Sequence, residues 1–253
     1  FYPSSASAIR RTIDGFLEKA SPPELTDVRA VVAPHAGYVY SGPVAGYDYK
    51  LLQGQPTPKR IFLMGPSHRA WFSGIAIGAY DAFRTPLGEV PVALDDAHAL
   101  AEERDLFALN ASSHTQEHCL EVQLPFLQVI YDAAPPIVPL LFGEVDPVAA
   151  GRILNEYVTA DDLIIVSSDL SHYHTNEQAH TLDRSFLDAL LAGNTRGIQK
   201  GEACGQAPAL TLTTIAEQRG WEPKLLDYRT SGDITGDTQR VVGDAAVVYV
   251  GES

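Results

Sequence analysis

Short apolar runs alternate with helical patterns along most of this chain. Each run has the length of a strand, and 163–166 has the continuous apolar character of a strand that is covered on both faces. The apolar runs are 28–33, 61–64, 137–142, 163–166, 224–228 and 245–250. The helical patterns are 95–103, 117–131, 177–191 and 209–218, with further helices beginning near Ser41 and at Asp146. This alternation predicts an α/β fold, a sandwich around a mostly parallel or mixed sheet.

Local signals refine this prediction. Ser41, Asp95 or Asp96, and Asp146 are expected N-caps, and Pro125 is expected to kink or break the helix over 117–131. The segments 74–80 and 90–94 flank Thr85-Pro-Leu-Gly88 and predict a hairpin-like excursion. The sheet is therefore not expected to be purely parallel.

Length and composition limit the classes of protein to consider. We find no internal repeat and no long linker in the 253 residues, so we expect one domain over 1–253. The formal charge is −14, from 18 basic and 32 acidic residues, which argues against nucleic acid as a partner. No apolar run approaches the roughly 20 residues of a membrane span. With two cysteines and no visible signal peptide, the sequence predicts a cytoplasmic protein.

Histidines follow three of the predicted strands. His35 comes after 28–33, His68 after 61–64, and Asp169 and His172 after 163–166. In open α/β sheets the carboxyl ends of the strands form the ligand-binding edge, so these side chains are expected to meet there. Neutral imidazole is the commonest protein ligand of Fe, Zn and Cu. The sequence therefore predicts a transition-metal site at this edge.

A third, anionic ligand remains open at this point. The candidates are Asp169, Glu117, Glu121 and Cys204. Cys204 lies just before a predicted helix, where a thiol is expected to have a lowered pKa and to ligate metals or act as a nucleophile. Cys119 falls in an apolar pattern and is expected in the core.

A competing pattern lies in the middle of the chain. His114-Thr-Gln-Glu117-His118 matches the H-x-x-E-H motif of zinc hydrolases. That chemistry requires both histidines on one helix face, whereas Ser112 and Ser113 are expected to place His114 before the helix or at its first position. A zinc hydrolase remains an alternative function.

Taken together, the motifs resemble the Memo family, known in bacteria and archaea as AmmeMemoRadiSam system protein B. The resemblance runs in order through essentially the whole chain. Its stretches are Phe1-Tyr-Pro3, Pro34–Tyr38, Gly65–His68, Glu117–Pro125, Ser167–Tyr173, Ala203–Gly205, Tyr228–Asp233 and Val241–Gly243.

The resemblance implies a fold like that of the class III extradiol dioxygenases, which use non-haem Fe(II). It implies one metal ion, iron or copper, held by His35, His68 and Cys204, with Zn as a further option. Asp169, His172 and His118 correspond to other residues of the same pocket. The chain departs from the family pattern at Gln206, Asp244 and Cys119.

From this we expect a metal-dependent redox or dioxygenase-like activity on an unknown small substrate. His172 is the expected acid or base, assisted by Asp169. A binding or scaffold protein that keeps an enzyme-like pocket is the alternative, because a shared fold does not establish shared chemistry. The expected partner is a small-molecule or peptide ligand, and the oligomeric state stays open.

Overall fold

The computed structural model describes residues 1–103 and 105–251. Its main sheet has the strand order β10-β11-β1-β8-β2-β7-β3-β6, and β9 pairs with β11. The four central strands are mutually parallel, and they are β1 (Val28–Ala33), β8 (Asp162–Ser167), β2 (Arg60–Pro66) and β7 (Ile137–Phe142). Antiparallel pairings lie on either side, through β11 (Val241–Val250), β10 (Glu222–Thr230), β9 (His172–His174) and β3 (Ile75–Ile77). The outer strand β6 (Phe107–Leu109) pairs with β3 in parallel. The mixed sheet confirms the predicted fold class.

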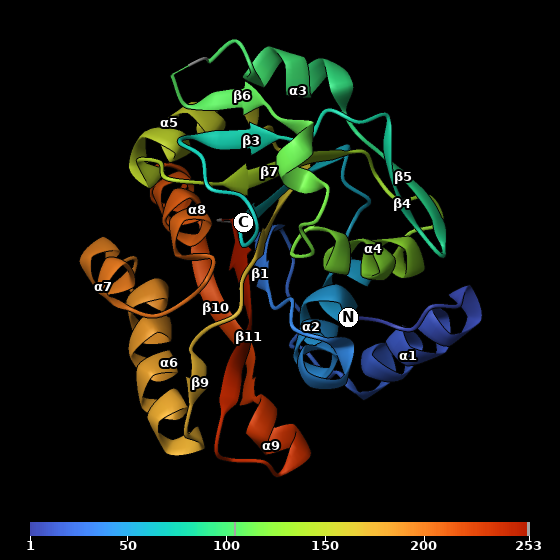
Figure 1. Cartoon of the computed structure of the whole chain (residues 1–253), viewed down its shortest axis with the longest axis vertical. Helices are drawn as coiled ribbons and strands as arrows, with labels where there is room; N and C mark the ends of the chain where they lie inside the picture. Colours follow the sequence, from blue (N-terminus) through green and yellow to red (C-terminus); the bar gives the residue numbers. More distant parts are fainter. Residues whose placement is uncertain (104, 252–253) are drawn as a thin grey trace.

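Helices cover both faces of the sheet (Figure 1). One face is covered by α1 (Ala6–Lys19), α2 (Tyr38–Gln53) and α4 (Leu124–Ile130). The other is covered by α5 (Pro147–Tyr157), α6 (Asn176–Leu191), α7 (Thr195–Lys200) and α8 (Gln206–Arg219). The shorter helices are α3 (Leu94–Leu100), α9 (Ser231–Thr235) and the 3₁₀ turns η1 (Ala111–His114) and η2 (Glu121–Gln123). Each face has its own apolar core, which explains the continuous apolar runs in the central strands.

The six predicted strands all lie within observed strands. A hairpin is present, as predicted, but its two strands are not the predicted segments 74–80 and 90–94. The hairpin joins β4 (Ala82–Thr85) to β5 (Gly88–Pro91), whereas β3 enters the main sheet. Two predicted caps are also wrong, because α2 begins at Tyr38 after Gly37 and α3 begins after Ala93. Asp146 caps α5 as predicted, accepting hydrogen bonds from the N–H groups of Val148 and Ala149.

The predicted helix over 117–131 is wrong in its first half. The chain forms a turn before η2, and the α-helix begins only at Leu124. The Glu117 side chain accepts hydrogen bonds from the backbone N–H groups of His68, His118 and Cys119. These backbone N–H groups bond to the Glu117 carboxylate, so the first part of the predicted helix does not form.

Glycine at position 65 allows β2 to pack closely against this turn. A Cβ atom there would lie 2.7 Å from the sulfur of Cys119 and 2.9 Å from Leu120. Cys119 is fully buried, as the sequence predicts. The end of β2 and the turn at Glu117 therefore pack tightly against each other. Gly65, where they meet, lies three residues before His68.

An unpaired acid lies inside α2. Asp48 is fully buried, and neither of its carboxylate oxygens has a hydrogen-bond partner among the described residues. Burial raises the pKa of Asp48 well above its ordinary value, and the nearby Asp227 carboxylate raises it further. Burial of Asp48 without a partner in the described part of the chain therefore favours its protonated form.

Candidate metal centre

The carboxyl ends of β1, β8 and β2 bring the predicted site residues together. These strands are neighbours and run in parallel, so the residues that follow them share one edge of the sheet. The rings of His35 and His68 have centroids 5.2 Å apart. Cys204 arrives from the segment before α8, and its sulfur lies 3.3 Å from His35 Nε2. The convergence expected from the sequence is observed.

Three groups of side chains at this edge have the spacing of metal ligands. They are His35, His68 and His118; His35, Asp169 and Cys204; and His68, Glu117 and Cys119. Within each group the ligand atoms all lie within 4.8 Å of one another. His35 and His68 each belong to two of the groups, which makes this pair the centre of the site.

The tautomer of His35 follows from its hydrogen bonds. Its Nδ1 lies 2.9 Å from Ser167 Oγ, and the Ser167 hydroxyl donates its single hydrogen to the Cys119 carbonyl at 2.6 Å. His35 Nδ1 must therefore donate, which leaves a lone pair on Nε2. Burial lowers the pKa of His35 to about 4, so this imidazole is neutral at pH 7.

A buried chain of hydrogen bonds supports this arrangement. Gln123 Nε2 donates to Ser167 Oγ at 2.8 Å and to the Pro34 carbonyl at 3.0 Å. Gln123 Oε1 accepts from the Tyr49 hydroxyl at 2.6 Å. The amide therefore has one orientation, and the acceptor role of Ser167 toward His35 is fixed. Our sequence reasoning assigned no role to Ser167 or Gln123.

His68 is oriented by Glu117. Oε2 of Glu117 accepts from the His68 backbone N–H at 2.6 Å, and Oε1 lies 2.9 Å from His68 Nδ1. Burial acts to raise the pKa of Glu117, but hydrogen bonds from His118 and His68 outweigh it and hold the pKa well below its usual range. Glu117 thus remains an anion that accepts from Nδ1–H and leaves Nε2 of His68 free. Glu117 thus orients His68, and it also has ligand spacing to His68 and Cys119.

Asp169 links His35 to His172. Its Oδ1 accepts from the backbone N–H groups of His35 at 2.6 Å and Ala36 at 3.1 Å. Its Oδ2 lies 3.7 Å from His35 Nε2 and 3.9 Å from His172 Nε2. The sequence predicts that Asp169 assists His172, and the two side chains are close enough for that role.

The expected lowering of the Cys204 pKa is not found. Burial raises the pKa of the Cys204 thiol well above its ordinary value, and the Asp169 carboxylate adds to this rise. The helix itself begins at Gln206, two residues further on, so its terminus is not close enough to outweigh burial. The Asp169 backbone N–H donates to Cys204 Sγ at 3.2 Å, and this hydrogen bond offsets part of the rise in the Cys204 pKa.

His118 lies against the same group of rings. Its ring centroid is 4.9 Å from that of His68 and 5.4 Å from that of His35. The Phe1 ring stacks on its other side at 4.2 Å. His118 is therefore in the pocket, as expected, and its position also makes it a candidate nitrogen ligand.

The remaining candidates lie elsewhere. His114 is in η1, where its Nε2 lies 2.9 Å from the Ala76 carbonyl, and no metal-ligand group among residues 1–103 and 105–251 includes it. The helix that the zinc hydrolase alternative needs for His114 and His118 is not formed. Glu121 accepts a hydrogen bond from the Tyr2 hydroxyl, and His174 pairs with Glu202 at 2.9 Å.

No helix within the described part of the chain has the length and apolar character needed to cross a membrane. This agrees with the absence of long apolar runs in the sequence.

Comparison with known proteins identifies relatives over the full length. Residues 1–248 match a family described as Memo-like protein. The MEMO1 family protein MK0963 of Methanopyrus kandleri is 33% identical over 98% of this chain and 95% of its own length. A MEMO1 family protein of Archaeoglobus fulgidus is 33% identical over 98% of this chain and 96% of its own length. The crystal structure of uncharacterized protein JW3007 from Escherichia coli K12 shares the fold, with a TM-score of 0.58 and 14% identity, covering 88% of this chain and 100% of that one.

Proposed function

The chain belongs to the Memo-like protein family, and from its site we propose that it is a metal-dependent redox enzyme. In this proposal His35, His68 and Cys204 hold one transition-metal ion. The observation that carries it is the pair of imidazoles whose Nδ1 atoms are engaged and whose Nε2 atoms carry a lone pair, with His35 Nε2 facing the half-buried Cys204 thiol at 3.3 Å. Metal-bound histidines characteristically use their second nitrogen in this way.

The spacing of two donor atoms supports the same assignment. Two ligands of a tetrahedral ion, one sulfur and one imidazole nitrogen, lie about 3.5 Å apart. His35 Nε2 and Cys204 Sγ are 3.3 Å apart, and His35 also has ligand spacing to His68. A bound cation would favour the Cys204 thiolate, since burial otherwise favours the protonated thiol. These donors thus fit a metal.

The ligand types bear on which metal is bound. Two imidazoles and a thiolate are softer than the two-histidine, one-carboxylate set of Fe(II) dioxygenases. We propose Fe(II) or Cu, with Zn as the redox-inactive option. The bound metal would supply electron transfer or activation of oxygen. Because the chemistry needs a reduced Cys204, we also propose a reducing compartment, the cytoplasm, in which both cysteines stay free.

His172 is the proposed acid or base. Its Nε2 is 3.9 Å from Asp169 Oδ2, and its side chain is partly exposed, so it can reach a bound substrate. Asp169 is held by the backbone N–H groups of His35 and Ala36 and can stabilise a protonated His172. Proton transfer at His172 Nε2 is therefore the step that this chain's own residues supply.

Exposed aromatic side chains accompany the site. Trp71 is 86% exposed and lies three residues after His68, and Tyr173, 65% exposed, is next to His172. Tyr40 is also exposed, and Phe1 stacks on His118. Of these, the Phe1 ring contacts the site itself and is 61% exposed, so it offers apolar surface to a ligand beside His118. We propose that a small-molecule or peptide ligand binds here. The exposed aromatic side chains also favour the second candidate function, a binding protein that retains an enzyme-like pocket.

Metal analysis and oxygen consumption of untagged protein test the proposed function. We expect close to one transition-metal ion per chain and metal-dependent turnover that is lost in the Cys204→Ala and His172→Ala variants. Wild-type protein without a transition metal would refute the redox enzyme. A partner that is still captured by both variants, with no oxygen uptake by the wild type, would favour the binding protein.

Ser167→Ala is expected to weaken metal binding by about 10–100-fold, the usual effect of removing a hydrogen-bond partner of a histidine ligand. The cause is loss of the acceptor that keeps the proton on His35 Nδ1. Metal competition titrations give the affinity, and ¹⁵N NMR of the metal-free protein gives the tautomer of His35 directly. Ser171→Ala removes another fully buried serine and is the matched control. Unchanged affinity together with an unchanged Nδ1 proton would contradict this role for Ser167.

A further inference from the structure

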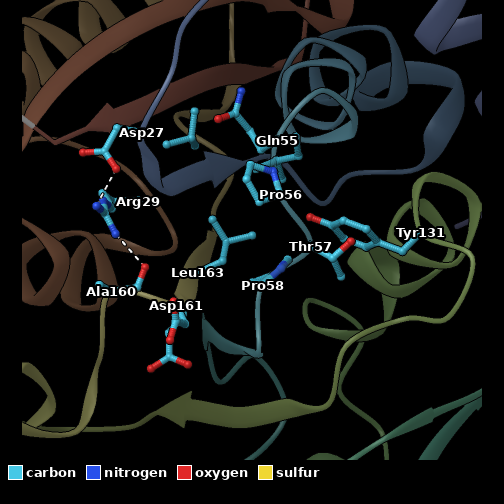
Figure 2. Close-up of a pocket in the computed structure, with 13 residues that line it drawn as sticks. Asp27, Arg29, Gln55, Pro56, Thr57, Pro58, Tyr131, Ala160, Asp161 and Leu163 are labelled. Atoms are coloured by element: carbon cyan, nitrogen blue, oxygen red, sulfur yellow. Dashed lines mark hydrogen bonds and ion pairs between the residues drawn. The ribbon is translucent and has the colours of Figure 1, made fainter. Parts of the chain in front are cut away.

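A pocket lies at the opposite edge of the sheet from the metal centre. It is bounded by residues 27–29, 55–58, Tyr131 and 160–163, together with Leu52, and its volume is about 430 Å³ (Figure 2). These segments lie at the amino ends of β1, β2 and β8. β1 is six residues long, so the pocket lies about 20 Å from the histidines. We call it the distal pocket.

The walls of the distal pocket are preformed. The Arg29 guanidinium donates to the Ala160 carbonyl at 2.6 Å and pairs with the Asp27 carboxylate (Figure 2). Asp27 has a positive φ of 57°, which turns the chain sharply before β1. The Lys59 backbone N–H donates to the Asp161 carbonyl at 2.7 Å. These interactions tie the loops before the three strands to one another across the pocket.

One polar side chain in the distal pocket lacks a partner. Tyr131 is only 7% exposed, and its hydroxyl makes no hydrogen bond with any described residue. Figure 2 shows the ring reaching from the end of α4 toward the middle of the pocket. Burial raises the pKa of Tyr131 to about 12, so the hydroxyl keeps its proton. An unsatisfied buried hydroxyl is unfavourable, and a bound molecule with a hydrogen-bonding group would relieve it.

The charges of the distal pocket select against anions. Its only cation, Arg29, is already engaged by Asp27 and Ala160, whereas the side chain of exposed Asp161 makes no ion pair among the described residues. The whole chain carries a charge of −14. A positively charged or neutral molecule is therefore favoured over a negatively charged one.

Apolar surface completes the distal pocket. Leu52 and Leu163 are buried side chains of its wall, and Pro56 and Pro58 are rigid, with no backbone N–H to satisfy. A flat ring can pack against such a surface, and the volume is in the range of small-molecule sites.

We propose that the distal pocket is a second ligand site, which takes a small organic cation with an aromatic ring. The ring lies against Pro56 and Pro58, the cationic group faces Asp161, and the buried Tyr131 hydroxyl turns toward the ligand to form a hydrogen bond with it. The proposal does not depend on the metal centre, because the two sites share no residue and lie at opposite edges of the sheet.

Benzamidine and benzoate test this proposal, because they share a ring and differ in charge. With the full chain, benzamidine is expected to shift the amide NMR signals of Gln55, Thr57 and residues 160–163, and benzoate is not. Asp161→Asn is expected to weaken benzamidine binding about fivefold, in keeping with an exposed ion pair. Tyr131→Phe is expected to weaken it about threefold, in keeping with one hydrogen bond.

Two matched variants control for indirect effects. Asp132→Asn removes an exposed acid that does not line the pocket, and Tyr249→Phe removes the hydroxyl of another buried tyrosine, one that lies in the core and not at the pocket. Both are expected to bind benzamidine like the wild type. The proposal is overturned by no benzamidine binding at 10 mM, by equal binding of benzoate, by shifts confined to the histidine site, or by full binding in both pocket variants. Tyr131→Phe is expected to keep or raise the melting temperature, so loss of binding there cannot be ascribed to unfolding.

Discussion

The His35→Ala, His68→Ala double variant is expected to retain less than about a tenth of the metal found in the wild type. Removing a single hydrogen-bond partner of a ligand costs about 10–100-fold in affinity, so loss of two ligands should exceed about a thousandfold. Both imidazoles carry a lone pair on Nε2, because Ser167 engages Nδ1 of His35 and Glu117 engages Nδ1 of His68. Elemental analysis of untagged protein, with a competition titration, measures the change.

The matched control is the His98→Ala, His180→Ala double variant. It removes two histidines from helices α3 and α6, away from the candidate ligands. We expect it to keep the wild-type metal content. Far-ultraviolet circular dichroism shows whether each variant is folded. Unchanged metal in a folded His35→Ala, His68→Ala variant would place the ion elsewhere and refute the assignment.

The Asp48→Asn variant is expected to be more stable than the wild type at pH 8 and nearly equal to it at pH 4. Burial raises the pKa of Asp48, so the folded chain keeps a proton that the unfolded chain releases above its ordinary pKa near 4. The folded state then binds more protons, and the free energy of unfolding falls by about 1.4 kcal/mol per pH unit until the folded-state pKa is reached. Asparagine has a similar shape and does not titrate, so the Asp48→Asn variant does not lose this stability as the pH rises.

Urea denaturation between pH 4 and pH 8 measures the effect. The Asp14→Asn variant, which alters an exposed acid on α1, is expected to follow the wild type. A pH dependence of stability that is identical in Asp48→Asn and wild type would show that Asp48 is ionised in the folded chain. The buried Asp244 is unchanged in both variants, so its contribution cancels in the comparison.

The positions of the candidate ligands could be predicted because they depend on strand ends. The apolar runs 28–33, 61–64 and 163–166 identify three buried strands, and a parallel sheet brings the residues after them to one edge. His35, His68 and Asp169 follow from this reasoning alone. Cys204 is different, because it lies before a helix, and its assignment as a ligand came from the resemblance to a family.

The residues that orient the ligands could not be predicted in the same way. Glu117 lies in a stretch whose apolar spacing is helical, but its carboxylate caps a turn instead. Ser167 and Gln123 are common polar residues, and their role depends on which neighbours tertiary packing brings within 3 Å. The Cys204 pKa could not be predicted from sequence either, because burial raises it by more than the nearby helix lowers it, and burial depends on tertiary packing.

The order of the central strands has a consequence for how the protein folds. β1 lies between β11 and β8, and His35 meets Cys204 across 169 positions of sequence. Contacts between residues so distant in the chain form slowly, because a large loop must close before any stabilising interaction is gained. The candidate ligands His35 and Cys204 therefore come together only when most of the sheet has formed. A metal that binds this geometry binds the folded state alone, so it stabilises the completed fold and gives no help to the early steps of folding.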